Sequence, residues 1–290
     1  MKYILIFFGL AATFTLKAQE NTTPYKVYDT RKQKVISVND IITDMQNADI
    51  LFFGEEHNDS IGHDLEMEIF RKLSIKYPQK IALSMEMFHT DVQLILNEYL
   101  ADLISEKNFM KEGRAWPNYN DYKPLVELAK SNRLQIIAAN AAARYSNAVT
   151  KSGLEILSKF PKESMGILPP LPIDTATGRY YQKFTDLLGG HSMGSMKVYQ
   201  TQNFWDATMA WSIAKFAKVN KGFKVLHLNG RFHSDEKLGT LAQLHQYAPK
   251  LRILNISAFA DASFSNPDWQ KFKSLGDYVI ITNPDVKKTY

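Results

Sequence analysis

The sequence predicts an α/β fold with a mostly parallel central sheet, helices on both faces and an inserted helical subdomain. Apolar runs of strand length recur at residues 50–53, 81–85, 134–139, 223–228, 251–256 and 278–282. Helical patterns lie between most of these runs, which is typical of βαβ units in a parallel sheet. The chain has 290 residues and a hydrophobic content of 45%, which suits one folded domain with a sizeable core.

Residues 1–18 have the features of a secretory signal peptide. Lys2 is followed by an apolar run over 3–14, and Leu-Lys-Ala precedes Gln19 as a cleavage site. We therefore expect an exported protein, periplasmic or extracellular, with a single α/β domain over residues 19–290. No later stretch approaches the roughly 20 apolar residues of a transmembrane helix, so none is expected in the mature chain.

Composition excludes several classes of protein. The chain has no cysteine, which rules out disulfides, thiolate ligands, a cysteine nucleophile and a lipoprotein anchor. Loss of Lys2 and Lys17 with the signal lowers the formal net charge from +5 to +3, and the remaining basic residues are spread out, so no nucleic-acid partner is expected. Nucleotide-binding glycine motifs and the serine-hydrolase elbow are also missing.

The first elements follow from local signals. Residues 25–38 have the pattern of a short hairpin, and Asn39 or Asp40 is a cap for a brief helix that ends near residue 46. After the run at 50–53, apolar residues at helical spacing predict a helix capped by Asn58, Asp59 or Ser60. The N-terminus of that helix should point toward the end of the strand before it.

The second half of the chain contains the insertion. Residues 146–200 hold Leu-Pro-Pro-Leu-Pro at 168–172, two adjacent glycines and several methionines and tyrosines, and we interpret them as an inserted helical subdomain or lid. Residues 204–219 carry many large apolar side chains and few charges, as expected for a helix buried against the sheet.

The motif Gly-x-x-His occurs twice, each time after an apolar strand. Gly-Glu-Glu-His follows the run at 50–53, and Gly-Arg-Phe-His at 230–233 follows the run at 223–228. Because loops that leave parallel strands collect at one edge of the sheet, His57 and His233 are predicted to face one crevice. Imidazole is a common ligand of transition metals and of haem iron. The alternative is that each histidine only caps a turn or packs in the core.

Other polar residues lie at the same predicted edge. Glu86 ends an otherwise hydrophobic strand, so its charge needs a bound cation or an ion pair. Of Glu55 and Glu56, one should enter the site and the other point away, and His63 lies six residues beyond His57. Other candidates are Asn140 and Arg144, which follow the next strand, and Arg231, which suits a carboxylate or propionate.

In the insertion, His191 and the tyrosines Tyr180, Tyr181 and Tyr199 are suited to holding a flat aromatic ligand. The alternative is that these side chains seal the insertion onto the core.

Together these segments resemble the ChaN-like haem-binding uptake family, part of the Tiki/erythromycin-esterase-like superfamily. The resemblance rests on six segments and on His63, and it covers most of the mature chain in order: residues 54–57, 84–88, 122–129, 138–140, 202–210 and 230–233.

This resemblance implies two activities. ChaN-like proteins are exported or membrane-associated haem binders linked to iron acquisition, and haem held by two protomers brings them together as a homodimer. A porphyrin would then lie under the insertion, with an axial ligand from His191 or one of the three tyrosines and its propionates near Arg231 or Arg144. In this family a tyrosine can hold the haem iron.

Tiki proteins are instead metal-dependent proteases. By this resemblance His57, Glu86 and His233 would hold a divalent transition metal, which His63 could join, with Glu55 or Glu56 as general base. Asn140 or Arg231 would then steady the oxyanion. We expect haem binding as the main role and metal-dependent hydrolysis as the alternative.

Overall fold

The structure is a computed structural model that describes residues 23–189 and 196–290. Within these residues, eight strands form one sheet in the order β2-β1-β8-β7-β3-β6-β4-β5. The six strands from β8 to β5 run parallel, and β1 and β2 add an antiparallel hairpin at one edge. The strands are β1 (Tyr25–Asp29), β2 (Lys34–Ile36), β3 (Ile50–Glu55), β4 (Ile81–His89), β5 (Gln135–Asn140), β6 (Lys224–Gly230), β7 (Ile253–Ala260) and β8 (Tyr278–Thr282).

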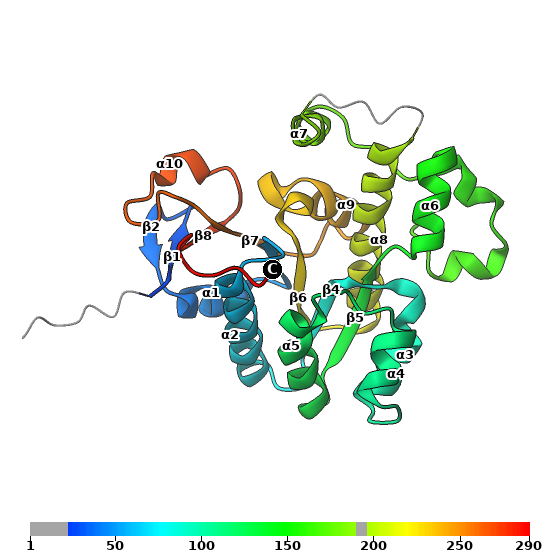
Figure 1. Cartoon of the computed structure of the whole chain (residues 1–290), viewed down its shortest axis with the longest axis horizontal. Helices are drawn as coiled ribbons and strands as arrows, with labels where there is room; N and C mark the ends of the chain where they lie inside the picture. The colour runs from blue at the N-terminus through cyan, green and yellow to red at the C-terminus, as the bar shows by residue number, and fades with distance from the viewer. Residues whose placement is uncertain (1–22, 190–195) are drawn as a thin grey trace, which may run out of the picture.

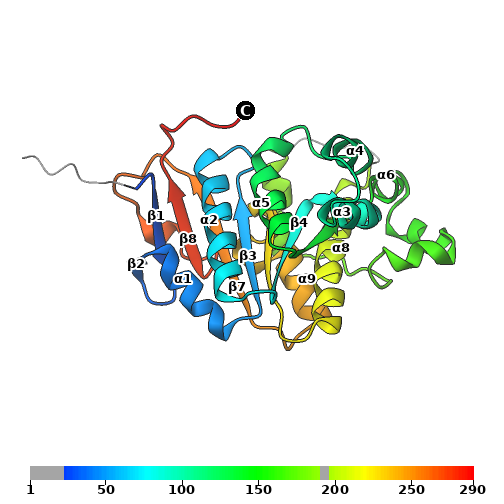
Figure 2. The ribbon, with the colours of Figure 1, turned by 90° about the horizontal axis from the view of Figure 1, so that it is seen from below.

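Helices cover both faces of this sheet (Figures 1 and 2), as the alternating pattern predicted. One face packs against α1 (Val38–Asp44), α2 (Ser60–Lys76), α3 (Gln93–Leu100) and α5 (Tyr119–Ser131), and the other against α8 (Val198–Val219) and α9 (Gly239–Tyr247). Successive residues of each strand serve opposite faces: Leu51 and Phe53 of β3 join the first core, and Ile50 and Phe52 join the second. The shorter helices are α4 (Glu106–Glu112), α6 (Ala143–Ser152), α7 (Arg179–Leu187) and α10 (Trp269–Phe272).

The strand order places a switch point at β3 and β6. From β3 the chain runs to β4 and β5 on one side, returns to β6 between β3 and β4, and then adds β7 and β8 on the other side of β3. The loop after β3 therefore leads to α2 on one face, and the loop after β6 leads to α9 on the other. In open α/β sheets a crevice forms at such a point, outside the carboxyl ends of the strands.

Two helix starts show how short polar side chains begin these elements. Asp59 caps α2, since its carboxylate accepts from the Ile61 amide at 3.1 Å. The first helix begins earlier than predicted: α1 is capped by Ser37, whose amide donates to the Asp40 carboxylate at 2.8 Å in a capping box. Asp40 thus contributes to the cap from inside the helix.

The segment predicted as an insertion forms α6, short 3-10 turns, α7 and the start of α8. Its side chains form a separate apolar cluster with Tyr145, Val149, Leu157 and Phe204, and Figure 1 shows α6 alongside α8. No helix in the described part of the chain is both long enough and apolar enough to cross a membrane.

Candidate functional site

The two Gly-x-x-His loops interlock at the switch point. Glu55 and Gly230 are partners at the ends of the parallel strands β3 and β6. A β-carbon at Gly230 would lie 2.7 Å from Nε2 of His57, and one at Gly54 would lie 3.0 Å from the α-carbon of Arg231. Each glycine therefore leaves room for a residue of the other loop.

His57 lies at the rim of the crevice with a third of its side chain exposed. Its Nδ1 is 2.6 Å from Oε1 of Glu55, and the same oxygen accepts from the Tyr122 hydroxyl at 2.6 Å. Burial lowers the pKa of His57, but the bond to Glu55 and the negative charge of Glu86 outweigh it and raise that pKa above its ordinary value. Glu55 thus orients the ring and favours its charged form.

His233 lies deeper and is held from both sides. Its Nδ1 is 2.7 Å from Oδ1 of Asp206, and its Nε2 is 3.6 Å from Oε1 of Glu86. Burial opposes the charged form of this ring, yet the two carboxylates raise the pKa of His233 to about 9. Asp206 also accepts from the Tyr180 hydroxyl at 2.5 Å and the Thr240 hydroxyl at 2.8 Å, so a buried network fixes its position.

Glu86 connects the two histidines. The side chain is almost fully buried, and its Oε2 accepts from the Gly230 amide at 2.7 Å. A β-carbon at Gly230 would lie 3.7 Å from this oxygen as well as beside His57. His57 and Glu86 therefore meet at Gly230, and His233 is joined to them through Glu86, so three neighbouring strand ends contribute to one group.

His63 lies beneath this group, on the first turn of α2. Its Nε2 donates to the His57 carbonyl at 3.2 Å, and its Nδ1 is 3.3 Å from Oε2 of Glu66 and 3.5 Å from Oε2 of Glu55. The side chains of Glu55, His63 and Glu66 are all buried. Glu66 was not singled out in the sequence, because a glutamate in a helical pattern indicates an exposed position.

A cavity of about 420 Å³ opens between the two loops, and we call it the crevice cavity. It is lined by Glu55, Glu56, His57, Asn58, Gly230, Arg231, Phe232, His233, Lys288 and Tyr290. Its volume is within the range of small-molecule sites, about 300–1,000 Å³.

The C-terminal tail contributes Lys288 and Tyr290 to this lining, and Figure 2 shows the chain end beyond the carboxyl end of β3. The Thr289 amide donates to the Asn58 carbonyl at 3.0 Å, and the Ser60 hydroxyl donates to the Lys287 carbonyl at 2.8 Å. No motif or periodicity marks these tail residues in the sequence.

Arg231 and Glu56 border the crevice cavity on one side. The Arg231 guanidinium pairs with Asp235 at 2.8 Å and lies 4.0 Å from the centre of the Phe259 ring. Glu56 points away from the histidines: its carboxylate is 3.9 Å from Arg231 and accepts from the Ala260 amide at 3.4 Å. Consecutive glutamates thus take opposite directions, with Glu55 buried inside.

The remaining candidates take other positions, and none of those in the described residues lines the crevice cavity. Tyr180 is part of the Asp206 network, the half-exposed Tyr181 packs edge-on against Tyr199, and the Tyr199 hydroxyl donates to the Ala176 carbonyl. Arg144 pairs with Asp91, and the side-chain Oδ1 of Asn140 accepts from the Ala141 backbone amide at 2.8 Å. His191 lies outside the described residues.

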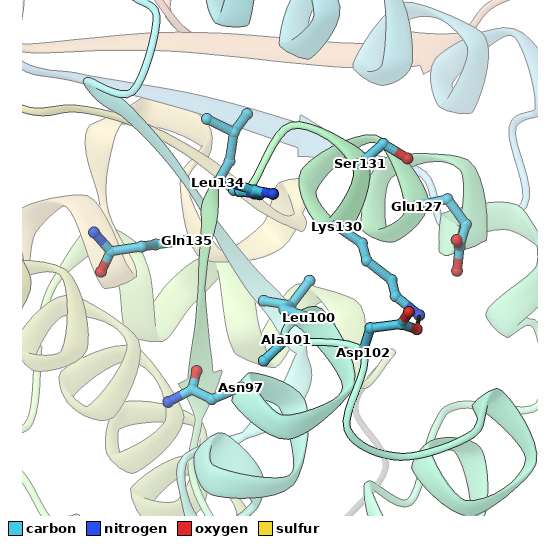
Figure 3. A pocket seen from close by; sticks show the side chains of 10 residues that line it. Asn97, Leu100, Ala101, Asp102, Glu127, Lys130, Ser131, Leu134 and Gln135 are labelled. Carbon is cyan, nitrogen blue, oxygen red and sulfur yellow. Dashed lines mark ion pairs between the residues drawn. The ribbon is translucent and has the colours of Figure 1, made fainter.

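A larger cavity, about 610 Å³, lies at the opposite edge of the sheet (Figure 3). It is formed by α3, α5 and the start of β5, and Lys130 pairs with Asp102 across it at 2.7 Å. Ligands of parallel sheets bind at the carboxyl edge, so the smaller crevice cavity is the stronger candidate.

Comparisons with known proteins identify the fold and the family of this chain. A structure of ChaN from Campylobacter jejuni, described as showing cofacial haem binding, superimposes with a TM-score of 0.67 at 20% identity. The alignment covers 89% of this chain and 97% of that chain, and it shows a shared fold. A mutant of the erythromycin esterase EreC, in its open conformation, aligns at 12% identity over 90% of this chain and 83% of that one, with a TM-score of 0.47.

A curated relative covers less of the chain. RETICULATA-RELATED 5, a chloroplastic protein of Arabidopsis thaliana, is 28% identical over 120 residues. These residues are 39% of this chain but 16% of the relative. A family model described as haem-binding uptake, Tiki superfamily, ChaN matches residues 41–244, which is well over half of the sequence. The chain therefore belongs to the ChaN family of haem-binding uptake proteins in the Tiki superfamily.

Proposed function

We propose that this protein is an exported haem-binding protein of haem or iron acquisition that holds its ligand in the crevice cavity. The observation that carries the proposal is the convergence of both Gly-x-x-His loops on one open cavity at the carboxyl edge of the sheet. Membership of the haem-binding family supports haem as the ligand.

The lining residues suit a haem chemically. His57 and Tyr290 offer an imidazole and a phenol, both of which are axial ligands of haem iron in proteins. Among the described residues no hydrogen bond is made by Nε2 of His57, and it is this nitrogen that faces Gly230. Lys288 and Arg231 supply positive charge for the propionates. Bound iron would supply the cofactor's colour and redox chemistry, while these residues bind and orient it.

Haemin titration of the haem-free and metal-free full chain tests the proposal. We expect a saturable Soret shift at micromolar protein, unchanged in the control His245→Gln, which removes an exposed histidine of α9. His57→Gln or Tyr290→Phe should move the Soret band or weaken binding by about tenfold or more. The absence of a saturable shift in the wild type would refute haem binding, and wild-type behaviour of both variants would refute this location.

Export and dimerisation are parts of the same proposal. The predicted signal, residues 1–18, lies outside the described residues. N-terminal sequencing of the exported fraction should begin at Gln19, and a mature protein that retains Met1 would contradict export. Sedimentation with and without haemin should show a monomer that becomes a dimer, and a constant mass would contradict a haem-bridged pair.

A second candidate is a metal-dependent hydrolase. The contact of His57 and Glu86 at Gly230, with His233 3.6 Å from Glu86, favours it. The residues fit a divalent metal, because Asp206 holds Nδ1 of His233 as outer carboxylates hold metal-binding histidines. The metal would lower the pKa of a bound water. Peptide and ester panels with zinc, manganese or cobalt should then show turnover that a chelator and His57→Ala abolish, and no turnover on any substrate would refute it.

A further inference from the structure

A second polar group lies beneath the floor of the crevice cavity, between β3 and the first turns of α2. Glu55, His63 and Glu66 are 2%, 7% and 0% exposed, and each offers a ligand atom within 4.8 Å of the other two. Ligands at about 2.0–2.2 Å from a metal lie about 3–4 Å apart. The observed spacing is therefore slightly wider than that of an occupied site and needs little movement to close.

The histidine presents a lone pair to the two acids. Its Nε2 is 3.2 Å from the His57 carbonyl, which can only accept, so Nε2 carries the proton. In the neutral ring Nδ1 is then an acceptor, 3.3 Å from Glu66 and 3.5 Å from Glu55. Metal-binding histidines are oriented in this way, by donation from the other ring nitrogen to a carbonyl or carboxylate.

Each of the two acids has one carboxylate oxygen that is unsatisfied within the described residues. Oε2 of Glu55 and Oε1 of Glu66 are buried and have no hydrogen-bond partner, and an orphan buried carboxylate oxygen is costly. Burial and the charge of Glu55 raise the pKa of Glu66 well above its ordinary value. Asp121, whose carboxylate is 3.8 Å from Nε2 of His63, adds negative charge nearby.

We propose that Glu55, His63 and Glu66 form a buried site for a divalent first-row transition cation of the Mn²⁺ or Zn²⁺ type, which adjoins the crevice cavity through Glu55. One imidazole with carboxylate oxygens suits these ions better than Ca²⁺ or Mg²⁺, which prefer oxygen alone. The cation would satisfy the orphan oxygens of Glu55 and Glu66.

Such an ion would also position the crevice. It would bind Glu55 through Oε2, while Oε1 of the same carboxylate holds His57 and accepts from Tyr122. The site would thus fix the end of β3 to α2 and hold His57 at the rim, whichever ligand the crevice cavity takes.

Manganese binding to the haem-free, chelator-treated full chain tests the site, with free Mn²⁺ counted by electron paramagnetic resonance. We expect one bound ion per chain in the wild type, in Glu86→Gln and in the control Glu68→Gln on the same helix. Glu66→Gln should weaken binding by about tenfold or more. The proposal is overturned if Glu66→Gln binds like the wild type, if Glu86→Gln loses the ion, or if millimolar Mn²⁺ does not bind to the wild type.

Because replacement of a buried carboxyl can unfold a chain, a second measurement leaves the three ligands intact. In the double variant His57→Gln and His233→Gln, electron spin-echo modulation of bound Mn²⁺ should still show one imidazole nitrogen, from His63. Loss of that nitrogen coupling would overturn the assignment of His63 as a ligand. The haemin titration tests the proposed function, and its outcome does not depend on either Mn²⁺ measurement.

Discussion

His227 lies in the middle of β6 and gives a prediction that depends on the fold alone. Its ring is fully buried, its Nδ1 is 2.9 Å from the Ser84 hydroxyl, and the Phe52 ring packs against it at 4.9 Å. Burial lowers the pKa of His227 to about 3. In the unfolded chain the pKa returns to about 6.5, so below pH 6.5 unfolding takes up a proton at this site.

The magnitude follows from proton linkage. Each pH unit below the unfolded pKa costs about 1.4 kcal/mol of stability until the folded pKa is reached. Between pH 8 and pH 5 the contribution of His227 to the free energy of unfolding therefore falls by about 2 kcal/mol.

The wild type alone will not reveal this loss, because His233 acts in the opposite direction. Its folded pKa is raised to about 9, so its stabilising contribution is complete below pH 6.5 and is lost as the pH rises through 9. Between pH 8 and pH 5 it adds about 2 kcal/mol as the pH falls, which offsets the change at His227.

Comparison with His227→Asn separates the two effects, since Asn can keep the bond to Ser84 but has no group that titrates. Urea unfolding of the haem-free wild type and of the haem-free variant at several pH values gives the free energy of unfolding of each. The wild-type advantage over the variant should shrink by about 2 kcal/mol from pH 8 to pH 5. A constant advantage would refute a buried neutral His227.

Three further predictions concern the crevice. Gly230→Ala places a β-carbon 2.7 Å from His57, so haemin affinity should fall about tenfold or more while the circular dichroism spectrum is kept; unchanged affinity would contradict a role for His57. Asp206→Asn leaves its buried donors poorly matched and should cost about 1–3 kcal/mol in urea unfolding, and a smaller loss would mean that the network is dispensable. Glu86→Gln removes the negative charge that raises the pKa values of His57 and His233. NMR titration should therefore find both pKa values lowered, and unchanged values would mean that Glu86 is not the source of that charge.

Much of the fold was predictable because it rests on periodic apolar patterns. Each of the six apolar runs overlaps a parallel strand, although the run at 251–256 begins two residues before β7. The hairpin predicted at residues 25–38 is formed by β1 and β2. The predicted cap of the first helix was wrong: Ser37 begins α1 and Asp40 lies inside it. Adjacent polar residues offer several starts to one helix, and the capping box, in which both side chains take part, decides between them.

The site was predictable only where its residues end strands. His57, Glu86 and His233 follow apolar runs, so the topology brings them to one edge. Asp206 and Glu66 lie in helices that pack on that edge, and a carboxylate in a helical pattern does not by itself indicate burial. Their roles depend on which face of the helix meets the strand ends, and this is a property of tertiary packing.

The reciprocal contacts of Gly54 and Gly230 explain why a repeated short motif is more informative than one copy. A single Gly-x-x-His needs no partner, because glycine suits many turns. Here a β-carbon at Gly230 would occupy the space of the His57 ring, and one at Gly54 would lie 2.7 Å from the Ser234 hydroxyl and 3.0 Å from the α-carbon of Arg231. The packing of each loop thus explains why the other loop has a glycine at its contact position. Two strand-ending copies therefore predict contact between the loops as well as a common edge, and the histidine that each loop carries is brought to the same crevice.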